Sequence, residues 1–152
     1  MKKKVAINGF GRIGRLVYRA FLERLNEFSN QYEISYINDL ADIDSNIHLL
    51  KYDTIHGPLN KEINKISNEQ FSIGENTVTV TSEKNPIDLK WKDKKVDIIL
   101  ECTGVFASKE KAMSHIESGA SKVIVSAPCS GADITVVQGV NNKNINIDHQ
   151  II

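Results

Sequence analysis

Apolar residues in this chain occur either in short continuous runs or at helical spacing. Residues 5–8 form a short apolar run that ends at a glycine. Apolar side chains then recur three and four positions apart, as they do on one face of a helix. This face is predicted to comprise Ile13, Leu16, Val17, Ala20, Phe21, Leu25 and Phe28, with Arg15, Arg19, Glu23 and Glu27 on the opposite side. Residues 34–38 form a second apolar run, so the order predicts a βαβ unit with a right-handed crossover between parallel strands.

The middle of the chain combines another helix with a predicted hairpin. A helix is expected to start near Asp44 or Ser45, because either side chain can cap a helix N-terminus. Residues 71–73 and 77–81 have strand-like composition and are separated by residues 74–76, which contain Gly and Asn. This arrangement indicates an antiparallel hairpin.

The last third of the chain returns to alternating strands and helices. Residues 96–100 form a continuous apolar run, which is typical of a buried strand. Ser108 is the expected N-cap of a helix that ends at Gly119. Residues 123–125 and 134–137 are predicted to be two further strands.

Together these elements predict an α/β fold: a Rossmann-type, mostly parallel twisted sheet with helices on both faces and a small antiparallel hairpin insertion. One domain is expected over residues 1–152, because the sequence contains no repeat, low-complexity tract or linker. A domain of this length buries roughly 70% of its unfolded-chain surface and needs no disulfide or metal. Ile151 and Ile152 carry no stop signal and are interpreted as part of an interrupted element.

Composition and charge exclude several classes of function. Nineteen basic residues balance nineteen acidic residues, so no net field favours nucleic acid or an anionic membrane. No apolar run approaches the roughly 18 residues of a membrane span, and the N-terminus lacks the pattern of a signal peptide. The two cysteines, Cys102 and Cys129, form no CxxC pair and suggest no disulfide framework. A cytoplasmic location is therefore expected.

The clearest chemical signal is the GxGxxG motif at residues 9–14, which follows a predicted strand and opens a predicted helix. Gly9 is expected to permit the tight turn, Gly11 to let the backbone approach a pyrophosphate, and Gly14 to let the helix pack against the strand. The helix N-terminus offers free N–H groups and a positive dipole end to phosphates. Arg12 is expected to add direct charge. Alone, this motif also fits a glycine turn that merely joins a strand to a helix.

Asp39 favours the dinucleotide interpretation, because it directly follows the second predicted strand. A carboxylate at this place accepts hydrogen bonds from the ribose hydroxyls of the adenosine half. It also repels a 2′-phosphate, at a like-charge cost of several kcal/mol. The sequence therefore predicts NAD, rather than NADP, as the cofactor.

Residues 8–15 and 37–39 resemble the start of the glyceraldehyde-3-phosphate dehydrogenase family far more closely than a general fingerprint requires. Further segments resemble that family in the same order, namely residues 48–53, 56–57, 102–106, 119–120, 126–128 and 139–141. Leu40 after the acid, in place of a proline, resembles the bacterial members. The cofactor-binding residues taken from the motif and the resemblance are Asn8, Gly9, Gly11, Arg12, Ile13, Gly14, Asn38, Asp39, Glu83, Lys84, Thr103, Gly104, Phe106 and Ser126.

The resemblance also assigns these residues to parts of the cofactor. It implies that the backbone of Arg12 and Ile13 binds the pyrophosphate, and that Asp39 binds the adenosine ribose. Glu83 and Lys84 would lie at the adenine edge, while Thr103, Gly104 and Phe106 would line the adenine and phosphate side. Ser126 would reach toward the nicotinamide ribose.

The resemblance further implies that this chain is only the cofactor half of an enzyme. The family's active-site segment, with its nucleophilic cysteine, would follow after Ile152, together with the activating histidine and the substrate-phosphate sites. The implied reaction is glycolytic: a thiolate attacks the aldehyde, hydride passes to NAD, and inorganic phosphate releases an acyl phosphate. The chain alone is expected to lack catalytic residues and to be inactive. The complete enzyme is expected to be a homotetramer.

Three other interpretations remain open. Erythrose-4-phosphate dehydrogenase resembles the same stretch, although it tends to carry glutamate in place of Asp39 and usually differs at residues 126–128. A stand-alone nucleotide-binding module is disfavoured by the abrupt end at Ile151 and Ile152. An interaction protein that retains the fold would not need an intact set of three glycines and Asp39.

Several other residues invite functional interpretations that the sequence does not support. Cys129 has no neighbouring base, and Cys102 ends a buried strand, where a cysteine commonly fills space. The four histidines lack zinc spacing, and the acidic residues from Asp42 lack the glycine and glutamate of a calcium loop. Trp91, which lies among lysines, is expected on an amphipathic surface segment rather than on a nucleic-acid surface.

Overall fold

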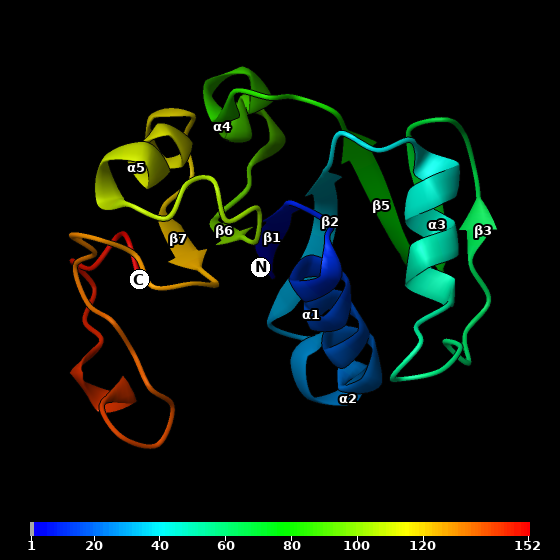
Figure 1. The fold of residues 1–152 in the computed structure, drawn as a ribbon, viewed down its shortest axis with the longest axis horizontal. Coiled ribbons are helices and arrows are strands. Elements are labelled where there is room, and N and C mark those ends of the chain that lie inside the picture. The colour runs from blue at the N-terminus through cyan, green and yellow to red at the C-terminus, as the bar shows by residue number, and fades with distance from the viewer. Residues whose placement is uncertain (1) are drawn as a thin grey trace.

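The computed structural model describes residues 2–152 and contains a seven-stranded sheet in the order β3-β4-β5-β2-β1-β6-β7 (Figure 1). The strands are β1 (Lys3–Asn8), β2 (Tyr32–Asn38), β3 (Asn64–Lys65), β4 (Gln70–Ile73), β5 (Asn76–Thr81), β6 (Ile98–Glu101) and β7 (Lys122–Val125). The α-helices are α1 (Arg12–Glu23), α2 (Leu25–Phe28), α3 (Ile43–Lys51), α4 (Trp91–Lys94) and α5 (Lys109–Glu117), with two 3-10 helices, η1 (Pro86–Leu89) and η2 (Asn142–Asn144).

Strands β5, β2, β1, β6 and β7 pair in parallel, whereas β3, β4 and β5 pair antiparallel at one edge. The predicted βαβ unit is confirmed, with Ile7 of β1 opposite Ile37 of β2. The predicted hairpin is also confirmed, because β4 and β5 pair across a turn at Gly74. The fold class is therefore the expected Rossmann-type sheet with an antiparallel insertion.

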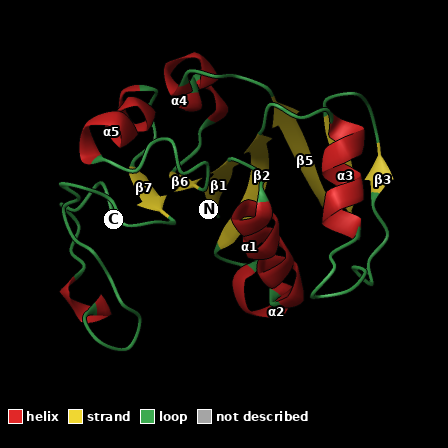
Figure 2. Cartoon of the chain, viewed as in Figure 1, coloured by secondary structure: helices red, strands yellow, loops and turns green. Residues whose placement is uncertain are grey.

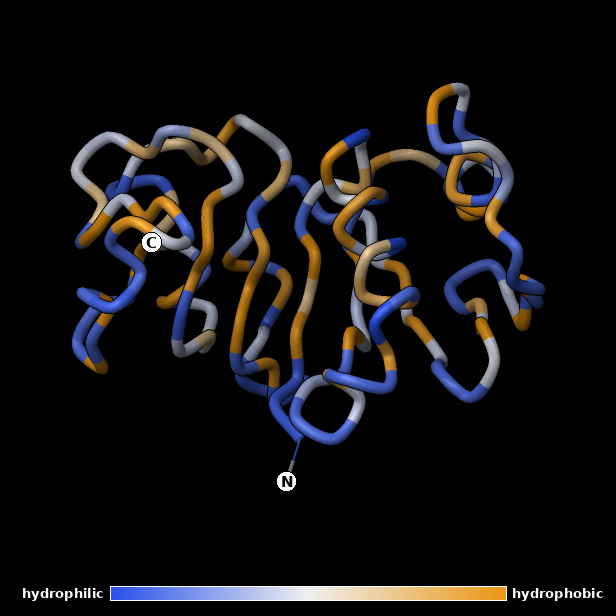
Figure 3. Tube along the Cα trace, turned by 90° about the horizontal axis from the view of Figure 1, so that it is seen from below, coloured by the Kyte–Doolittle hydropathy of each residue, from blue (hydrophilic) through white to orange (hydrophobic). Residues whose placement is uncertain are grey.

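The sheet has a separate hydrophobic core on each face, because apolar side chains of the strands point alternately to the two faces. Successive side chains of a strand point to opposite faces, so Val5 and Ile7 enter one core while Ala6 enters the other. Helices α1 and α3 cover the first core, and η1, α4 and α5 cover the second (Figure 2). Figure 3 shows hydrophobic residues along the extended segments in the middle of the molecule and hydrophilic residues at many of the turns.

The orientation of α1 corrects the sequence prediction. Its buried residues are Gly14, Tyr18, Arg19 and Leu22. Ile13, which was expected on the buried face, is 47% exposed. Arg19, which was expected on the solvent side, is buried because its guanidinium donates five hydrogen bonds to main-chain oxygens of Leu50, Lys51 and Gly57.

Other details of the predicted elements also change. Helix α3 begins at Ile43, two or three residues earlier than expected, because Asp42, not Asp44 or Ser45, caps it by accepting from the Ser45 N–H at 2.8 Å. Ser108 does cap α5, as predicted, by accepting from the Lys111 N–H.

The region around Trp91 is a surface segment only in part. Lys90, Lys92 and Lys95 are exposed and Lys94 is half-buried, but Trp91 itself is completely buried in the second core. Its indole packs edge-on against Tyr36, with ring centroids 6.4 Å apart. The expectation that the tryptophan lies on the surface is therefore wrong.

The end of the described chain also differs from expectation. Residues 134–137 form no strand, although they have strand-like composition. Ile151 instead lies beside β7 and forms a parallel bridge with Val123. Asp133 holds this segment in place by accepting from the main-chain N–H groups of Gln150 and Ile151, each at 2.8 Å. The sheet therefore continues past β7 through a residue far along the chain.

Candidate functional site

A groove of about 440 Å³ lies over the carboxyl ends of β1, β2 and β6. Its lining residues are Asn8, Gly9, Gly11, Asn38, Asp39, Leu40, Glu83, Lys84, Cys102, Thr103, Val105 and Phe106. Ligands of open parallel sheets bind in a crevice at this end of the strands. The position of the groove is therefore the one that the fold favours for a ligand.

The glycine-rich turn between β1 and α1 forms the floor of the groove. A side chain would have a different effect at each of its three glycines. Gly9 has φ of +89°, and an added Cβ would lie 2.7 Å from the Thr103 nitrogen. An added Cβ at Gly14 would lie 2.2 Å from the carbonyl oxygen of Gly9, so α1 packs directly on the turn. A Cβ at Gly11 would meet nothing within 4 Å. The open space above Gly11 suits a ligand that approaches the backbone.

The N-terminus of α1 faces this space. Gly11 is its N-cap and makes no side-chain capping bond. The first bond of the helix runs from the Arg15 N–H to the Gly11 carbonyl, at 3.1 Å. The N–H groups of the first turn precede that bond and have no partner within the helix. They form a small anion-binding surface, which the helix dipole reinforces.

Asp39 stands beside the glycine turn with its carboxylate fixed by main-chain donors. Oδ2 accepts from the Phe10 N–H at 2.7 Å, and Oδ1 accepts from the Ala41 N–H at 2.9 Å. A carboxylate has about four acceptor positions, so each oxygen retains capacity for another donor. Asp39 therefore fits a ligand that presents two hydroxyl groups.

Below the groove, Asn38 and Asn8 are buried side by side on neighbouring strands. Asn38 Nδ2 donates to Asn8 Oδ1 at 2.8 Å, and Asn38 Oδ1 accepts from the Glu83 N–H, also at 2.8 Å. Thr81 Oγ1 donates to the same Asn38 oxygen. Both amides are thus engaged within the protein, which makes them supports of the groove.

Glu101, at the end of β6, extends this polar layer toward the second core. Oε2 accepts from Asn8 Nδ2 at 2.6 Å and is 2.9 Å from His115 Nε2. Oε1 accepts from the Thr103 N–H at 2.8 Å and also from the Thr103 hydroxyl. Burial alone would raise the pKa of Glu101, but the hydrogen bonds from His115, Thr103 and Asn8 outweigh burial and lower it. Glu101 is therefore a buried carboxylate that four donor groups stabilise.

The structure brings together most, but not all, of the predicted cofactor residues. Nine of them line the groove, and Arg12, Ile13 and Gly14 adjoin it through the first turn of α1. Gly104, with φ of +76°, follows Thr103 in the β6–α5 loop. Ser126 lines a separate hollow beyond β7, but it adjoins the groove, because its side chain hydrogen-bonds Cys102 and its main-chain N–H donates to the Glu101 carbonyl oxygen at 3.0 Å.

The side chain of Arg12, which was expected to add direct charge, has an acidic partner within the protein. Its guanidinium pairs with Asp53, with Nη1 3.1 Å from Oδ2. Main-chain donors His56 and Ile55 hold the Asp53 carboxylate and, together with Arg12, lower its pKa to about 2. The positive charge of Arg12 is thus already matched by an ionised partner.

Sequence analysis missed five residues at or below the groove. Leu40, Val105 and Cys102 line it, and Glu101 and His115 lie beneath it. Two signals were available in the sequence: Glu101 is a charged residue at the end of an apolar run, and His115 falls on the same helix face as Ala112. Neither signal reveals that the two residues contact each other.

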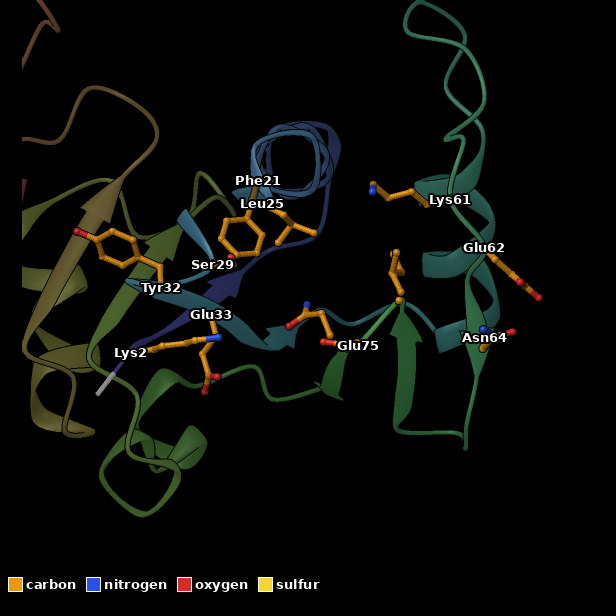
Figure 4. Close-up of a pocket in the computed structure, with 13 residues that line it drawn as sticks. Lys2, Phe21, Leu25, Ser29, Tyr32, Glu33, Lys61, Glu62, Asn64 and Glu75 are labelled. Carbon is orange, nitrogen blue, oxygen red and sulfur yellow. The ribbon is translucent and has the colours of Figure 1, made fainter. Parts of the chain in front are cut away.

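A second hollow, of about 610 Å³, lies at the opposite end of the parallel strands. Figure 4 shows Phe21 and Leu25 on one side of it and Lys61 and Glu62 on the other. None of the predicted cofactor residues lines this hollow. Over residues 2–152, no group of three or more histidine, cysteine or acidic residues is arranged to hold a metal ion.

A parallel sheet with a glycine turn after β1, an open helix N-terminus and an acid after β2 defines a dinucleotide-binding domain of the Rossmann type. Comparison with known families then specifies which one. Residues 3–109 match the family model described as glyceraldehyde 3-phosphate dehydrogenase, NAD binding domain, and the chain belongs to this family. The cofactor of the domain is accordingly NAD.

Curated relatives agree with this assignment over the whole chain. Glyceraldehyde-3-phosphate dehydrogenase of Xanthobacter flavus is 44% identical over 152 residues, which cover 100% of this chain and 44% of the relative. The Thermotoga maritima enzyme is 46% identical over 149 residues, covering 98% of this chain and 44% of the relative. The chain therefore spans less than half the length of these relatives. Among residues 2–152, no helix is long and apolar enough to cross a membrane.

Proposed function

We propose that this chain is the NAD-binding half of a phosphorylating glyceraldehyde-3-phosphate dehydrogenase of glycolysis. The observation that carries the proposal is the geometry of Asp39, whose two oxygens are held by the main chain beside an open glycine turn. The family match and the relatives support the same enzyme. The nucleophilic cysteine, its histidine and the substrate-phosphate sites would belong to a second half, without which the chain is inactive.

The residues present fit NAD in both charge and shape. The first turn of α1 and the open face of Gly11 would hold the pyrophosphate. Asp39 would accept from both adenosine ribose hydroxyls, and Glu83 and Lys84 would flank the adenine. Bound NAD would supply a hydride acceptor for aldehyde oxidation. The protein's own task here is to bind the cofactor and fix its orientation.

Asp39 also supports NAD over NADP. A 2′-phosphate would bring at least one further negative charge close to a carboxylate that is fixed in place. Such a like-charge contact costs several kcal/mol. The same aspartate supports the glyceraldehyde enzyme over erythrose-4-phosphate dehydrogenase, which resembles this chain but tends to carry glutamate there. A homotetramer in the cytoplasm remains the expected state of the complete enzyme.

Calorimetric titration of the 152-residue chain with NAD and NADP tests the cofactor proposal. We expect NAD to bind with a dissociation constant of roughly micromolar to millimolar size, and NADP to bind at least about tenfold more weakly. Asp39→Asn, which removes the charge and keeps the shape, should abolish most of this difference. Glu75→Gln, at the distant hairpin turn, is the matched control. Equal affinity of the unaltered chain for the two nucleotides would contradict the proposal.

A separate assay tests the proposed inactivity. The chain is mixed with glyceraldehyde 3-phosphate, NAD and inorganic phosphate, and NADH formation is followed by absorbance. We expect no turnover above the rate without protein. Turnover that survives repurification would show that the catalytic groups lie within these 152 residues.

A further inference from the structure

The strongest unexplained feature of the chain is the buried ionised group below the groove. Glu101 is 1% exposed and His115 is fully buried, yet no lysine or arginine pairs with the carboxylate among the contacts of the described residues. An isolated buried charge is costly unless it is hydrogen-bonded. The four donor groups on Glu101 offset that cost, and they come from β1, the β6–α5 loop and α5.

The direction of every hydrogen bond in this layer is fixed by groups that can only donate. The indole N–H of Trp91 donates to His115 Nδ1 at 3.1 Å, so the ring proton of a neutral His115 lies on Nε2 and points at Glu101. On the other side, the main-chain N–H of Glu83 sets the orientation of the Asn38 amide. Asn38 in turn sets the orientation of Asn8. Both series of hydrogen bonds end at Glu101, which must accept from His115 and from Asn8.

Glu101 connects two of the chain segments that line the groove. One oxygen holds Asn8, which directly precedes Gly9. The other oxygen holds Thr103, whose backbone packs so closely on Gly9 that no side chain fits between them. The Thr103 hydroxyl also accepts from the Val105 N–H at 3.0 Å, which extends the same support to the groove wall.

We infer that Glu101, held by His115, is a positioning residue for the dinucleotide: it fixes Thr103 and Val105 against the glycine turn and so sets the shape of the groove. This inference rests on the proposed function, because it concerns the same NAD site. Glu101 is buried beneath the groove and acts through Thr103, not through contact with the cofactor. Phe106, at the far end of the wall, packs edge-on against the His115 ring, with centroids 5.9 Å apart.

Glu101→Gln is the informative variant, because it keeps the size of the side chain and changes one acceptor into a donor. Whichever way the new amide points, its NH₂ group faces donors. Toward Thr103 it meets a main-chain N–H, and toward Asn8 it meets an amide that Asn38 prevents from turning. Ile99→Val, a buried change two residues earlier on β6, is the matched control.

The experiment compares NAD affinity by calorimetry with ligand-free ¹H–¹⁵N spectra of the 152-residue chain. We expect Glu101→Gln to weaken NAD binding roughly tenfold or more, as loss of a charge-assisted hydrogen bond does. The Thr103 and Val105 amide resonances should shift before any ligand is added. Ile99→Val should leave the affinity and both resonances unchanged. Unchanged affinity in Glu101→Gln, or unmoved Thr103 and Val105 resonances, would overturn the inference.

If Glu101→Gln does not fold, Thr103→Val takes its place. Thr103 is exposed, so the fold should survive, and valine lacks only the hydroxyl that bonds Glu101 and Val105. We expect weaker NAD binding and faster solvent exchange of the Val105 amide, and unchanged exchange would overturn the inference. A wild-type chain that binds no NAD would overturn the proposed function as well. Normal NAD binding by both wild type and variant would overturn the positioning role alone.

Discussion

Arg19 of α1 donates to the main-chain oxygen of Leu50 on α3 through both Nε and Nη2, at 3.0 and 2.9 Å. No carboxylate pairs with this buried guanidinium in the described part of the chain. Carbonyl oxygens at the end of α3 and at Gly57 accept its hydrogen bonds instead. The negative end of a helix dipole stabilises a cation at this position. Arg19 therefore joins the two helices that cover one face of the sheet.

Arg19→Met should destabilise the fold by about 3 kcal/mol, because it leaves several buried carbonyl groups without a donor. Urea unfolding followed by circular dichroism measures this loss. Arg24→Met is the matched control, since Arg24 is exposed, pairs with Glu27 on the surface and lies over the Phe28 ring at 4.8 Å. The loss of stability in Arg24→Met should be much smaller, because solvent screens a surface ion pair. Similar losses for the two variants would show that the Arg19 bonds contribute little.

Substitution by alanine should affect the stability of the fold very differently at Gly14 and at Gly11. Gly14→Ala forces a Cβ against the Gly9 carbonyl, so we expect a loss of stability of several kcal/mol. Gly11→Ala meets no neighbour and should change stability by less than about 1 kcal/mol. It should nevertheless weaken NAD binding, because the methyl group occupies the open face. Thermal unfolding and calorimetry, applied to both variants, separate the two effects. Equal loss of stability would contradict this division.

Acid should release the Ile151 segment before the rest of the fold. The Ile151 N–H, followed by Lys109 and the Gln150 N–H, lowers the pKa of Asp133 to about 2. A depressed carboxyl pKa contributes stability above its unfolded value of roughly 3.9, and this contribution is lost as pH falls toward 2. Amide exchange at Ile151 should therefore accelerate across this window. In Asp133→Asn it should be fast at every pH, and a flat profile in the wild-type chain would refute the assignment.

NAD should protect one of the two free cysteines from alkylation. Cys102 lines the groove, whereas Cys129 lies in the separate hollow beyond β7. Burial raises the pKa of both thiols, so the reaction is best followed near pH 9 by mass spectrometry. We expect saturating NAD to slow modification of Cys102 and to leave Cys129 unaffected. Equal protection of both would indicate a general tightening of the chain instead of occupancy of the groove.

Features encoded by neighbouring residues could be predicted from the sequence. The glycine turn depends on the backbone of residues 9–14, and Asp39 follows the end of its strand, so both appear in a local pattern. The hairpin at residues 70–81 is equally local. Each of these predictions agrees with the structure in position and type.

Features decided by distant partners could not be predicted in this way. The charge of Arg19 suggested a solvent position, but carbonyl groups more than thirty residues away make its burial favourable. The burial of Trp91 could not be predicted for a similar reason, because its indole N–H donates to the distant, buried His115. The residues at 134–137 have strand-like composition, yet Ile151 takes the position beside β7. Burial and edge pairing are properties of the assembled sheet and have no local pattern.

The central position of β1 has a consequence for synthesis on the ribosome. β1 emerges well before β6, which is one of its two neighbours, because Glu101 follows Asn8 by 93 positions. At about 5–20 residues per second, the edge of β1 stays unpaired for roughly 5–20 s. An open apolar strand edge is a template for aggregation. The nascent chain should therefore need protection, by a chaperone or the ribosome surface, until β6 has been made.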